Sequence, residues 1–246
     1  MVRRIVEALR AAPDDTLVEI GPGRGILTAA LIETKAPVVA IEIDRDLAAQ
    51  LRERYDAGTL RLIEGDALEV SLASIGPSLA VAGNLPYNIS KPFAMKLVDE
   101  RHTVARAVLM FQREVAMRLT GRPGTGDYGP LTVLAGRAFT IERLFDVPPG
   151  AFRPRPKVVS TVTRWMPRPA ADLPSDDVSA LKSALRAAFA HRRQTIGKNL
   201  RQELSLDDRM VARLLEEAGI DPGLRAEAVD PDAFLRLAAA MRRRAI

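Results

Sequence analysis

The residues best suited to chemistry stand in the tetrapeptide Asn84-Leu85-Pro86-Tyr87. The apolar run at 79–83 precedes this tetrapeptide and is typical of a buried strand. A polar amide, a rigid proline and an aromatic ring therefore follow the carboxyl end of a strand, which is the edge where open α/β sheets bind ligands. We expect a helix to follow, at 91–100, with Ser90 as its cap and Pro92 in its first turn.

This tetrapeptide suits the attack of an exocyclic amine such as N6 of adenine. That nitrogen is a poor nucleophile because its lone pair is delocalised into the ring. The side-chain oxygen of Asn84 and the carbonyl of Leu85, held in place by Pro86, could accept from the amine and free the lone pair. The Tyr87 ring could stack on the base, which is worth about 1–3 kcal/mol, or face the positive charge of a sulfonium methyl donor. The alternative is a plain strand-to-helix turn, because Asn and Pro are common in turns.

A second pattern, Glu-x-Gly-x-Gly-x-Gly, runs from Glu19 to Gly25 between an expected strand and an expected helix. A dinucleotide fingerprint would place its third glycine at position 26, where Ile26 stands. The spacing is closer to the cofactor loop of S-adenosylmethionine-dependent methyltransferases. Gly21, Gly23 and Gly25 would let the backbone approach the cofactor closely, although a tight turn without a ligand would use the same residues.

Acidic side chains stand at or just after the ends of the next two expected strands. Glu42, near the end of the strand at 37–44, could accept hydrogen bonds from both hydroxyls of a ribose. Asp66 follows the strand at 60–64 and could accept from the amino group of an adenine. The alternatives are a helix cap for Glu42, a role that Asp44 fits better, and a solvated turn for Asp66. The recurrence of such residues at successive strand ends favours a binding site.

Composition limits the classes of protein and of site. The chain has 246 residues, of which 47% are hydrophobic, a formal charge of +5 and a pI near 9.9. A basic balance favours a polyanionic partner. The lack of cysteine excludes thiolate chemistry and cysteine-bound zinc, and His102 and His191 have no metal-ligand spacing. Without a membrane span or a signal peptide, we expect a soluble, cytoplasmic monomer without metal.

A basic, proline-rich loop at 148–157 separates the last two expected strands, 139–146 and 158–165. Phe152 is its single aromatic residue, and its cations are Arg153, Arg155 and Lys157. Such a loop could stack on a flipped base and hold its phosphates. The alternative is a hairpin connection with Phe152 in the core.

The stretch at 166–175 is the best candidate for a linker between two domains. Alternating strands and helices before it predict a Rossmann-like α/β domain at 1–166, with a mostly parallel sheet and helices on both faces. After it, the small all-helical domain at 176–246 is expected to hold helices at 178–190, 192–203, 207–218 and 231–243. Arg192, Arg193 and Lys198 would give this domain a basic face for RNA, or only a solvated surface.

In sequence order, these motifs resemble those of the ribosomal RNA adenine dimethyltransferases, and of the KsgA family most closely. The matching segments are Val18-Glu19-Ile20-Gly21-Pro22-Gly23, Val39-Ala40-Ile41-Glu42-Ile43-Asp44, Gly65-Asp66-Ala67, Asn84-Leu85-Pro86-Tyr87-Asn88-Ile89-Ser90, Asp127-Tyr128-Gly129, Val147-Pro148-Pro149-Gly150-Ala151-Phe152 and Pro154-Arg155-Pro156-Lys157-Val158. The last two are the most specific, and the resemblance covers nearly the whole chain.

The resemblance implies transfer of two methyl groups from S-adenosylmethionine to N6 of each of two adjacent adenosines near the 3′ end of small-subunit ribosomal RNA. It also implies three groups of site residues. The cofactor would be bound by Glu19, Gly21, Gly23, Gly25, Glu42, Ile43, Asp66, Ala67 and Asn84. The target base would be bound by Asn84, Leu85, Pro86, Tyr87 and Phe152, and the RNA by Arg153, Arg155, Lys157, Arg192, Arg193 and Lys198.

Two alternatives stay open. The first is the Erm family, which methylates large-subunit RNA and has Ile where Leu85 stands here; the tail motifs Gly219-Ile220-Asp221-Pro222 and Arg225-Ala226-Glu227 are closer to the KsgA family. The second is an RNA-binding assembly factor with impaired catalysis. The family has a further segment ahead of the residue that aligns with Met1, and this segment closes over the cofactor. We therefore expect this chain to fold and bind RNA but to bind S-adenosylmethionine weakly.

Overall fold

The computed structural model describes residues 1–153, 155–169 and 175–246, with the side chains of 175–177 left aside. Contacts between residues divide the chain into two compact units. Met1–Ala116 and Phe139–Pro167 form the first, called here the sheet unit, and Met117–Ala138 and Arg168–Ile246 form the second, the helical unit. The functional division into domains at 1–166 and 176–246 stays a prediction.

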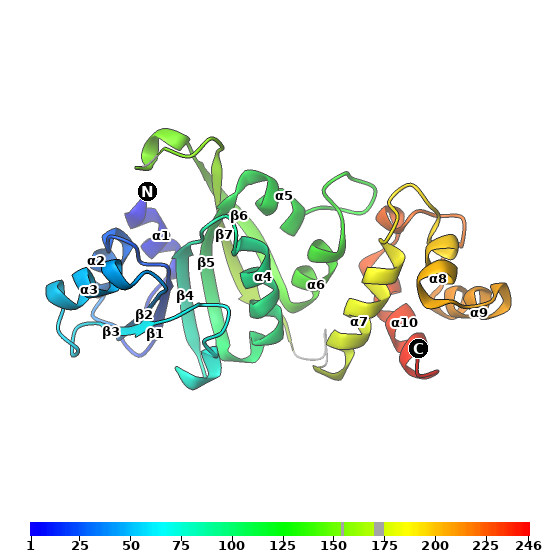
Figure 1. The fold of residues 1–246 in the computed structure, drawn as a ribbon, viewed down its shortest axis with the longest axis horizontal. Coiled ribbons are helices and arrows are strands. Elements are labelled where there is room, and N and C mark those ends of the chain that lie inside the picture. The colour runs from blue at the N-terminus through cyan, green and yellow to red at the C-terminus, as the bar shows by residue number, and fades with distance from the viewer. Residues whose placement is uncertain (154, 170–174) are drawn as a thin grey trace. The chain divides into compact units, whose positions relative to one another are not determined.

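The sheet unit holds a seven-stranded sheet in the order β3-β2-β1-β4-β5-β7-β6 (Figure 1). The first five strands in sequence are parallel, and β7 is antiparallel to both β5 and β6. The strands are β1 Thr16–Ile20, β2 Val38–Glu42, β3 Arg61–Glu64, β4 Leu79–Asn84, β5 Val104–Gln112, β6 Phe139–Val147 and β7 Ser160–Pro167. This confirms the predicted Rossmann-like sheet.

The central strands are buried on both faces, which explains their continuous apolar runs. All five residues of β2 and the first five of β4 are buried. At the end of β4, a Cβ on Gly83 would lie 2.8 Å from the carbonyl oxygen of Ile20 on β1. Glycine therefore lets these two strands approach closely just before Asn84.

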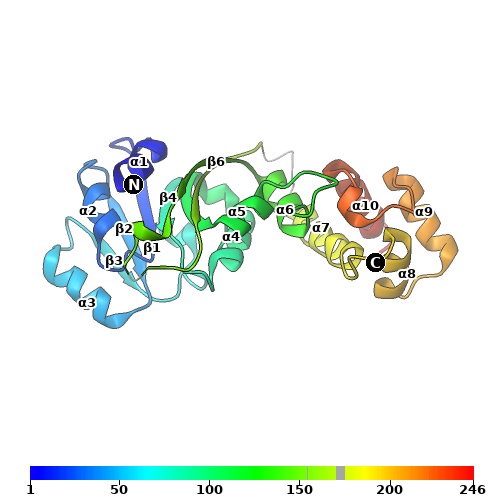
Figure 2. The same ribbon diagram turned by 90° about the horizontal axis from the view of Figure 1, so that it is seen from above.

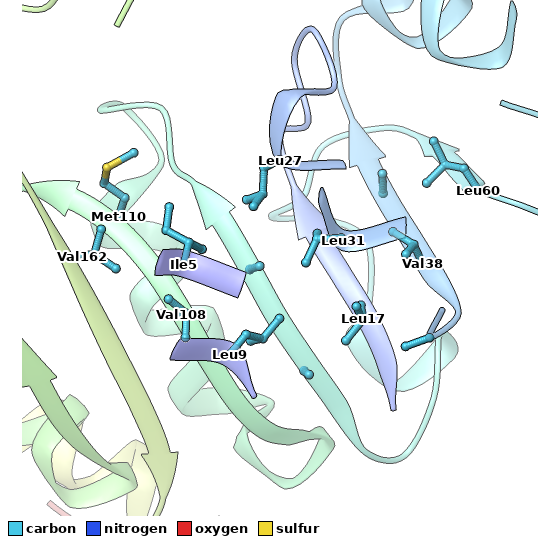
Figure 3. Close-up of a cluster of buried hydrophobic side chains, with 14 of the residues drawn as sticks. Ile5, Leu9, Leu17, Leu27, Leu31, Val38, Leu60, Val108, Met110 and Val162 are labelled. Carbon is cyan, nitrogen blue, oxygen red and sulfur yellow. The ribbon is translucent and has the colours of Figure 1, made fainter. Parts of the chain in front are cut away.

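Helices cover the two faces of this sheet. They are α1 Val2–Leu9, α2 Ile26–Ile32, α3 Arg45–Arg54 and α4 Ser90–Asp99, and α5 Arg113–Leu119 begins directly after β5. Figure 2 shows α1 and α4 on opposite sides of the sheet. On the α1 side, Ile5 and Leu9 of α1 and Leu27 and Leu31 of α2 pack over Leu17 and its neighbours in β1, β4 and β5 (Figure 3).

Arg106 on β5 ties α1 to the sheet. Its guanidinium donates to the carbonyls of Leu9 and Arg10, at the C-terminus of α1, and pairs with Asp15. A cation at this end of a helix satisfies carbonyls that have no partner within the helix. Arg4, on α1 itself, makes a further contact with the sheet and lies 3.6 Å from the centre of the Phe145 ring on β6.

The helical unit combines an internal segment with the C-terminal part of the chain. Its complete helices are α6 Pro130–Ala138, α7 Ser175–Ala188, α8 Ile196–Leu204, α9 Asp208–Ala218 and α10 Pro231–Arg242. The hydroxyl of Tyr128, ahead of α6, donates to the carbonyl of Val229, ahead of α10, at 2.8 Å. The rings of Phe189 and Phe234 lie 5.5 Å apart and join the C-terminal segments to each other.

Three local predictions were wrong. Ser90 does not cap α4, because its hydroxyl donates to the carbonyl of Pro86 at 3.0 Å and Ile89 occupies the capping position. The helix expected at 192–203 begins only at Ile196, where the Thr195 side chain caps it. The predicted linker begins two residues too early, since Met166 and Pro167 belong to β7; residues 170–174 of that linker lie outside the described part.

Among the described residues, none of the helices is both long enough and apolar enough to cross a membrane. The same residues contain no group of three or more His, Asp or Glu side chains arranged to hold a metal ion.

Candidate nucleotide-cofactor and RNA site

The predicted site residues of the sheet unit follow strands that end at one edge. β1, β2, β3 and β4 are parallel neighbours, so the loops after them lie side by side. β6 ends at this edge too, because it runs antiparallel to β7, which is itself antiparallel to β5. The glycine loop, the two acids, the Asn84 tetrapeptide and the basic loop therefore share the carboxyl edge of the sheet, which we call the site edge.

The Asn84 tetrapeptide leads from the last residue of β4 into a turn at 87–89 and keeps its apolar residue inside; we call this connection the Asn84 turn. Asn84 pairs in register with Met110 of β5, and the N–H of Leu85 donates to the Met110 carbonyl at 3.3 Å. Leu85 is only 2% exposed, whereas Asn84 is exposed and Tyr87 is 44% exposed. The buried leucine thus anchors a turn whose amide and aromatic ring remain accessible.

The glycine loop adopts a backbone that side chains disfavour. Gly21, Gly23 and Gly25 have φ values of 65°, 58° and 78°, in the left-handed region that glycine enters without a steric penalty. A Cβ on Gly23 would meet no atom within 4 Å, and one on Gly21 would meet only Pro86, at 3.8 Å. The loop after β1 therefore lies beside the Asn84 turn and leaves open space at Gly23.

Glu42 is held by two backbone N–H groups. Its Oε2 accepts from Gly23 and its Oε1 from Asp44, each at 2.9 Å. Glu42 is 5% exposed, so both oxygens have fixed directions. Each carboxylate oxygen keeps a second lone pair for a ligand. The prediction that Asp44 caps α3 is confirmed, since its side chain accepts from the N–H groups of Asp46 and Leu47.

The Glu19 side chain is buried and bonds to α2, the helix that follows the glycine loop. Its carboxylate is 2% exposed and accepts a hydrogen bond from the Thr28 hydroxyl of α2 at 2.6 Å. Burial, together with the charge of Glu42, raises the pKa of Glu19 to about 7, although the Thr28 bond opposes this shift. Glu19 therefore ties β1 to α2, and its role in the cofactor site stays a prediction.

We expect Glu19 to make folding stability depend on pH. Because its pKa of about 7 in the folded protein exceeds the ordinary 4.5, the folded state binds more protons between these values. The free energy of unfolding should therefore fall by about 3 kcal/mol as pH rises from 4.5 to 7. Glu19→Gln, which keeps an acceptor for Thr28, should remove this part. Urea unfolding at pH 5 and pH 8 measures it, and an equal stability difference between the two proteins at both pH values would contradict it.

The other predicted cofactor residues lie on the loops after β2 and β3. Ile43 is 66% exposed directly after Glu42. Asp66 is half-buried and accepts from the N–H of Leu68 at 2.8 Å, and Ala67 is buried. Asp66 thus shapes its own loop and keeps its second oxygen available.

The basic loop between β6 and β7 presents its cations but not its ring. Arg153, Arg155 and Lys157 are exposed. Phe152 is half-buried and packs against the apolar cluster drawn in part in Figure 3. A role for Phe152 on the target base stays a prediction.

In the helical unit, the basic residues flank a turn between α7 and α8. The Asn199 side chain, which is 1% exposed, donates to the carbonyls of Ala188 and His191 at 2.7 and 3.2 Å. Arg192 donates to the carbonyl of Gly126 at 3.1 Å, while Arg193 and Lys198 are exposed. The supporting roles of Asn199 and Thr28 were not predicted from the sequence. The only signal for Asn199 was its position shortly after Arg192 and Arg193.

Comparison with known proteins shows which family this architecture represents. The family model described as ribosomal RNA adenine dimethylase matches residues 1–242. Ribosomal RNA small subunit methyltransferase A of Aromatoleum aromaticum is 45% identical over 227 residues, which are 92% of this chain and 83% of that protein. The protein of the same name from Bordetella pertussis is 44% identical over 241 residues, 98% of this chain and 89% of that protein.

Two solved structures extend the likeness to both units. A dimethyladenosine transferase from Plasmodium falciparum has a TM-score of 0.81 and 26% identity, and the match covers 100% of this chain and 96% of that one. The 23S rRNA methyltransferase ErmE has a TM-score of 0.70 and 29% identity, covering 98% and 96%.

The mostly parallel sheet, the glycine loop and the acid at the end of β2, together with the family match, define an S-adenosylmethionine-dependent methyltransferase. The family match makes the assignment specific. This chain belongs to the ribosomal RNA adenine dimethylase family, and it is a methyltransferase of ribosomal RNA.

Proposed function

We propose that this protein transfers two methyl groups to N6 of each of two adjacent adenosines near the 3′ end of small-subunit ribosomal RNA, during assembly of that subunit in the cytoplasm. The names of the relatives that are 44–45% identical support the small subunit. The large-subunit alternative is weaker, since ErmE is 29% identical. The exposed Asn84 amide beside the glycine loop is the observation that carries the proposal, and it opposes an assembly factor without catalysis.

The residues at the site edge fit S-adenosylmethionine. Glu42, with its oxygens fixed by Gly23 and Asp44, would accept from the ribose hydroxyls. The open space at Gly23 would let the backbone approach the cofactor. The remaining cofactor contacts would come from Gly21, Gly25, Ile43, Asp66, Ala67 and Asn84, while Glu19 would support the loop from beneath. When bound, the cofactor supplies an electrophilic methyl group on a sulfonium.

The Asn84 turn would prepare the amine. The Asn84 side-chain oxygen and the Leu85 carbonyl would accept from the two N–H groups of N6, and Tyr87 would stack on the base. Acceptors placed in advance act without reorganisation during the reaction. After transfer, N6 would lose a proton to solvent, so no general base is needed. Arg153, Arg155, Lys157, Arg193 and Lys198 would hold RNA phosphates, and Arg192 would steady the basic turn.

The proposal is tested by incubating the protein with labelled S-adenosylmethionine and small subunits that lack these methyl groups. After incubation, the RNA is digested to nucleosides. We expect labelled N6,N6-dimethyladenosine in small-subunit RNA. Label in large-subunit RNA alone would select the Erm-type alternative, and no transfer to either RNA would contradict an active enzyme.

A further inference from the structure

We propose that Arg113 binds a backbone phosphate next to the target adenosine, and that Asp146 and Thr161 position its guanidinium for this contact. The proposal rests on the proposed function, because it assumes that an RNA base enters the Asn84 turn. It adds a phosphate site directly after β5, the strand next to that turn. None of the sequence motifs above contains Arg113, Asp146 or Thr161, and only the fold brings these residues together.

Arg113 lies at the site edge, one strand away from Asn84. Asn84 pairs with Met110 of β5, and Arg113 is the third residue after Met110 along the chain. Strand spacing and rise place the Arg113 Cα roughly 11 Å from that of Asn84. The Arg113 N–H donates to the carbonyl of Val159 at 3.0 Å, so the backbone at this point is fixed.

The side chain of Arg113 is oriented by a carboxylate, while its N–H donors remain available to a ligand. Its Nε lies 3.8 Å from Oδ2 of Asp146, and the two side chains are 62% and 48% exposed. The separation is too long for a hydrogen bond, so the guanidinium donors stay available to a ligand. The buried Thr161 hydroxyl donates to Oδ1 of Asp146 at 2.6 Å and fixes that carboxylate. β6 and β7 pair these two residues directly across the hairpin.

This arrangement contributes little to folding, because exposed ion pairs are worth little in water. It does suit a phosphate, whose oxygens match the planar fork of a guanidinium. Other exposed cations stand at the same edge, namely Lys91 at the start of α4 and Arg153, Arg155 and Lys157 on the basic loop. Arg113 differs from them because a carboxylate orients it.

The expected reaction needs a contact of this kind. A base can reach the Asn84 turn only after leaving its stack, and phosphate contacts fix the backbone of a displaced nucleotide without reading its sequence. Arg113 stands on the side of the Asn84 turn toward β7 and the basic loop, away from the glycine loop after β1. We therefore assign it to the RNA and not to the cofactor.

The test measures kcat/KM for unmethylated small subunits at several KCl concentrations and fixed Mg²⁺. Arg113→Ala should lower kcat/KM about tenfold and flatten the plot of its logarithm against log salt by about one unit. Arg113→Lys keeps the charge and should restore the slope. Thr161→Val should lower kcat/KM and leave the slope unchanged, because it removes the positioning and not the charge.

Arg164→Ala is the matched control. Arg164 forms an ion pair with Glu142 at 2.6 Å on the same hairpin, but four residues farther along β7 from Ser160, away from the site edge. It should leave both kcat/KM and the slope unchanged. Equal behaviour of Arg113→Ala and Arg164→Ala, or a lysine that does not restore the slope, would overturn the proposal. If the wild-type protein methylates large-subunit RNA instead, only the proposed function fails, and the same variants on that RNA decide the role of Arg113.

Discussion

Asn84→Ala should slow methyl transfer by about 100- to 1000-fold, which corresponds to a loss of roughly 2.7–4 kcal/mol from one preorganised polar group. Asn84 is exposed at the end of β4, where its amide is free to meet a substrate, and the buried Leu85 holds the turn behind it. The protein should remain folded, because the substitution removes no side chain from the core. Single-turnover rates on unmethylated small subunits, with saturating S-adenosylmethionine, give the effect directly.

Asn88→Ala provides the control for Asn84. Asn88 is also exposed and lies four residues further along the same connection, ahead of α4. It should retain most of the wild-type rate, and both variants should unfold at nearly the wild-type temperature. A single-turnover rate for Asn84→Ala within threefold of wild type would remove Asn84 from the reaction.

Glu42→Gln should weaken cofactor binding by about 10- to 100-fold. A glutamine has one acceptor oxygen and can accept from only one of the two N–H groups that donate to Glu42. Its NH₂ group would face the N–H of either Gly23 or Asp44, each now 2.9 Å from a carboxylate oxygen. In the complex, the NH₂ group would also replace an oxygen that is expected to accept from a ribose hydroxyl, and a hydrogen-bonding group left without its partner costs about 1–3 kcal/mol. Calorimetry with S-adenosylhomocysteine measures the change in Kd.

Glu64→Gln is the matched substitution for Glu42. Glu64 pairs in register with Glu42 on the neighbouring strand, but it is exposed and forms ion pairs with Arg45 and Arg52. The same chemical change at this position should leave the Kd of S-adenosylhomocysteine unchanged. If the two variants bind equally well, the fixed carboxylate of Glu42 is not part of the cofactor site.

The mostly parallel sheet could be predicted, although not its strand order, because its strands and helices follow local signals. Apolar strands alternate with amphipathic helices, and glycines or acids end the strands, so the site edge is visible in the sequence. The direction of each side chain was not visible. Glu19 belongs to the glycine motif, yet its carboxylate is buried and bonds to Thr28 of α2. Phe152 stands in a loop with three exposed cations, yet its ring packs against the core.

The helical part was harder to predict because its turns are set by contacts between distant residues. Nothing between Phe189 and Gln194 is a glycine or a proline, so helical periodicity left only position 191 between the two helices and placed the second start too early. Asn199 ends α7 by bonding to carbonyls 8 and 11 residues earlier. Thr195 was the one local signal for the start of α8, since threonine is a common cap.

The membership of residues 117–138 in the helical unit has a consequence for the order of synthesis. The ribosome releases α6 before α7 and α10, and it releases β5 before its partner β7, so both units are incomplete until late in translation. The hydrogen bond from Tyr128 to Val229, which lies 101 residues further along the chain, can form only after the segment that separates them has been synthesised. A fragment that begins at Arg168 would lack α6 and Tyr128. The helical unit is therefore not one continuous C-terminal segment, and such a fragment would also lack Gly126, whose carbonyl accepts from Arg192 in the turn ahead of α8.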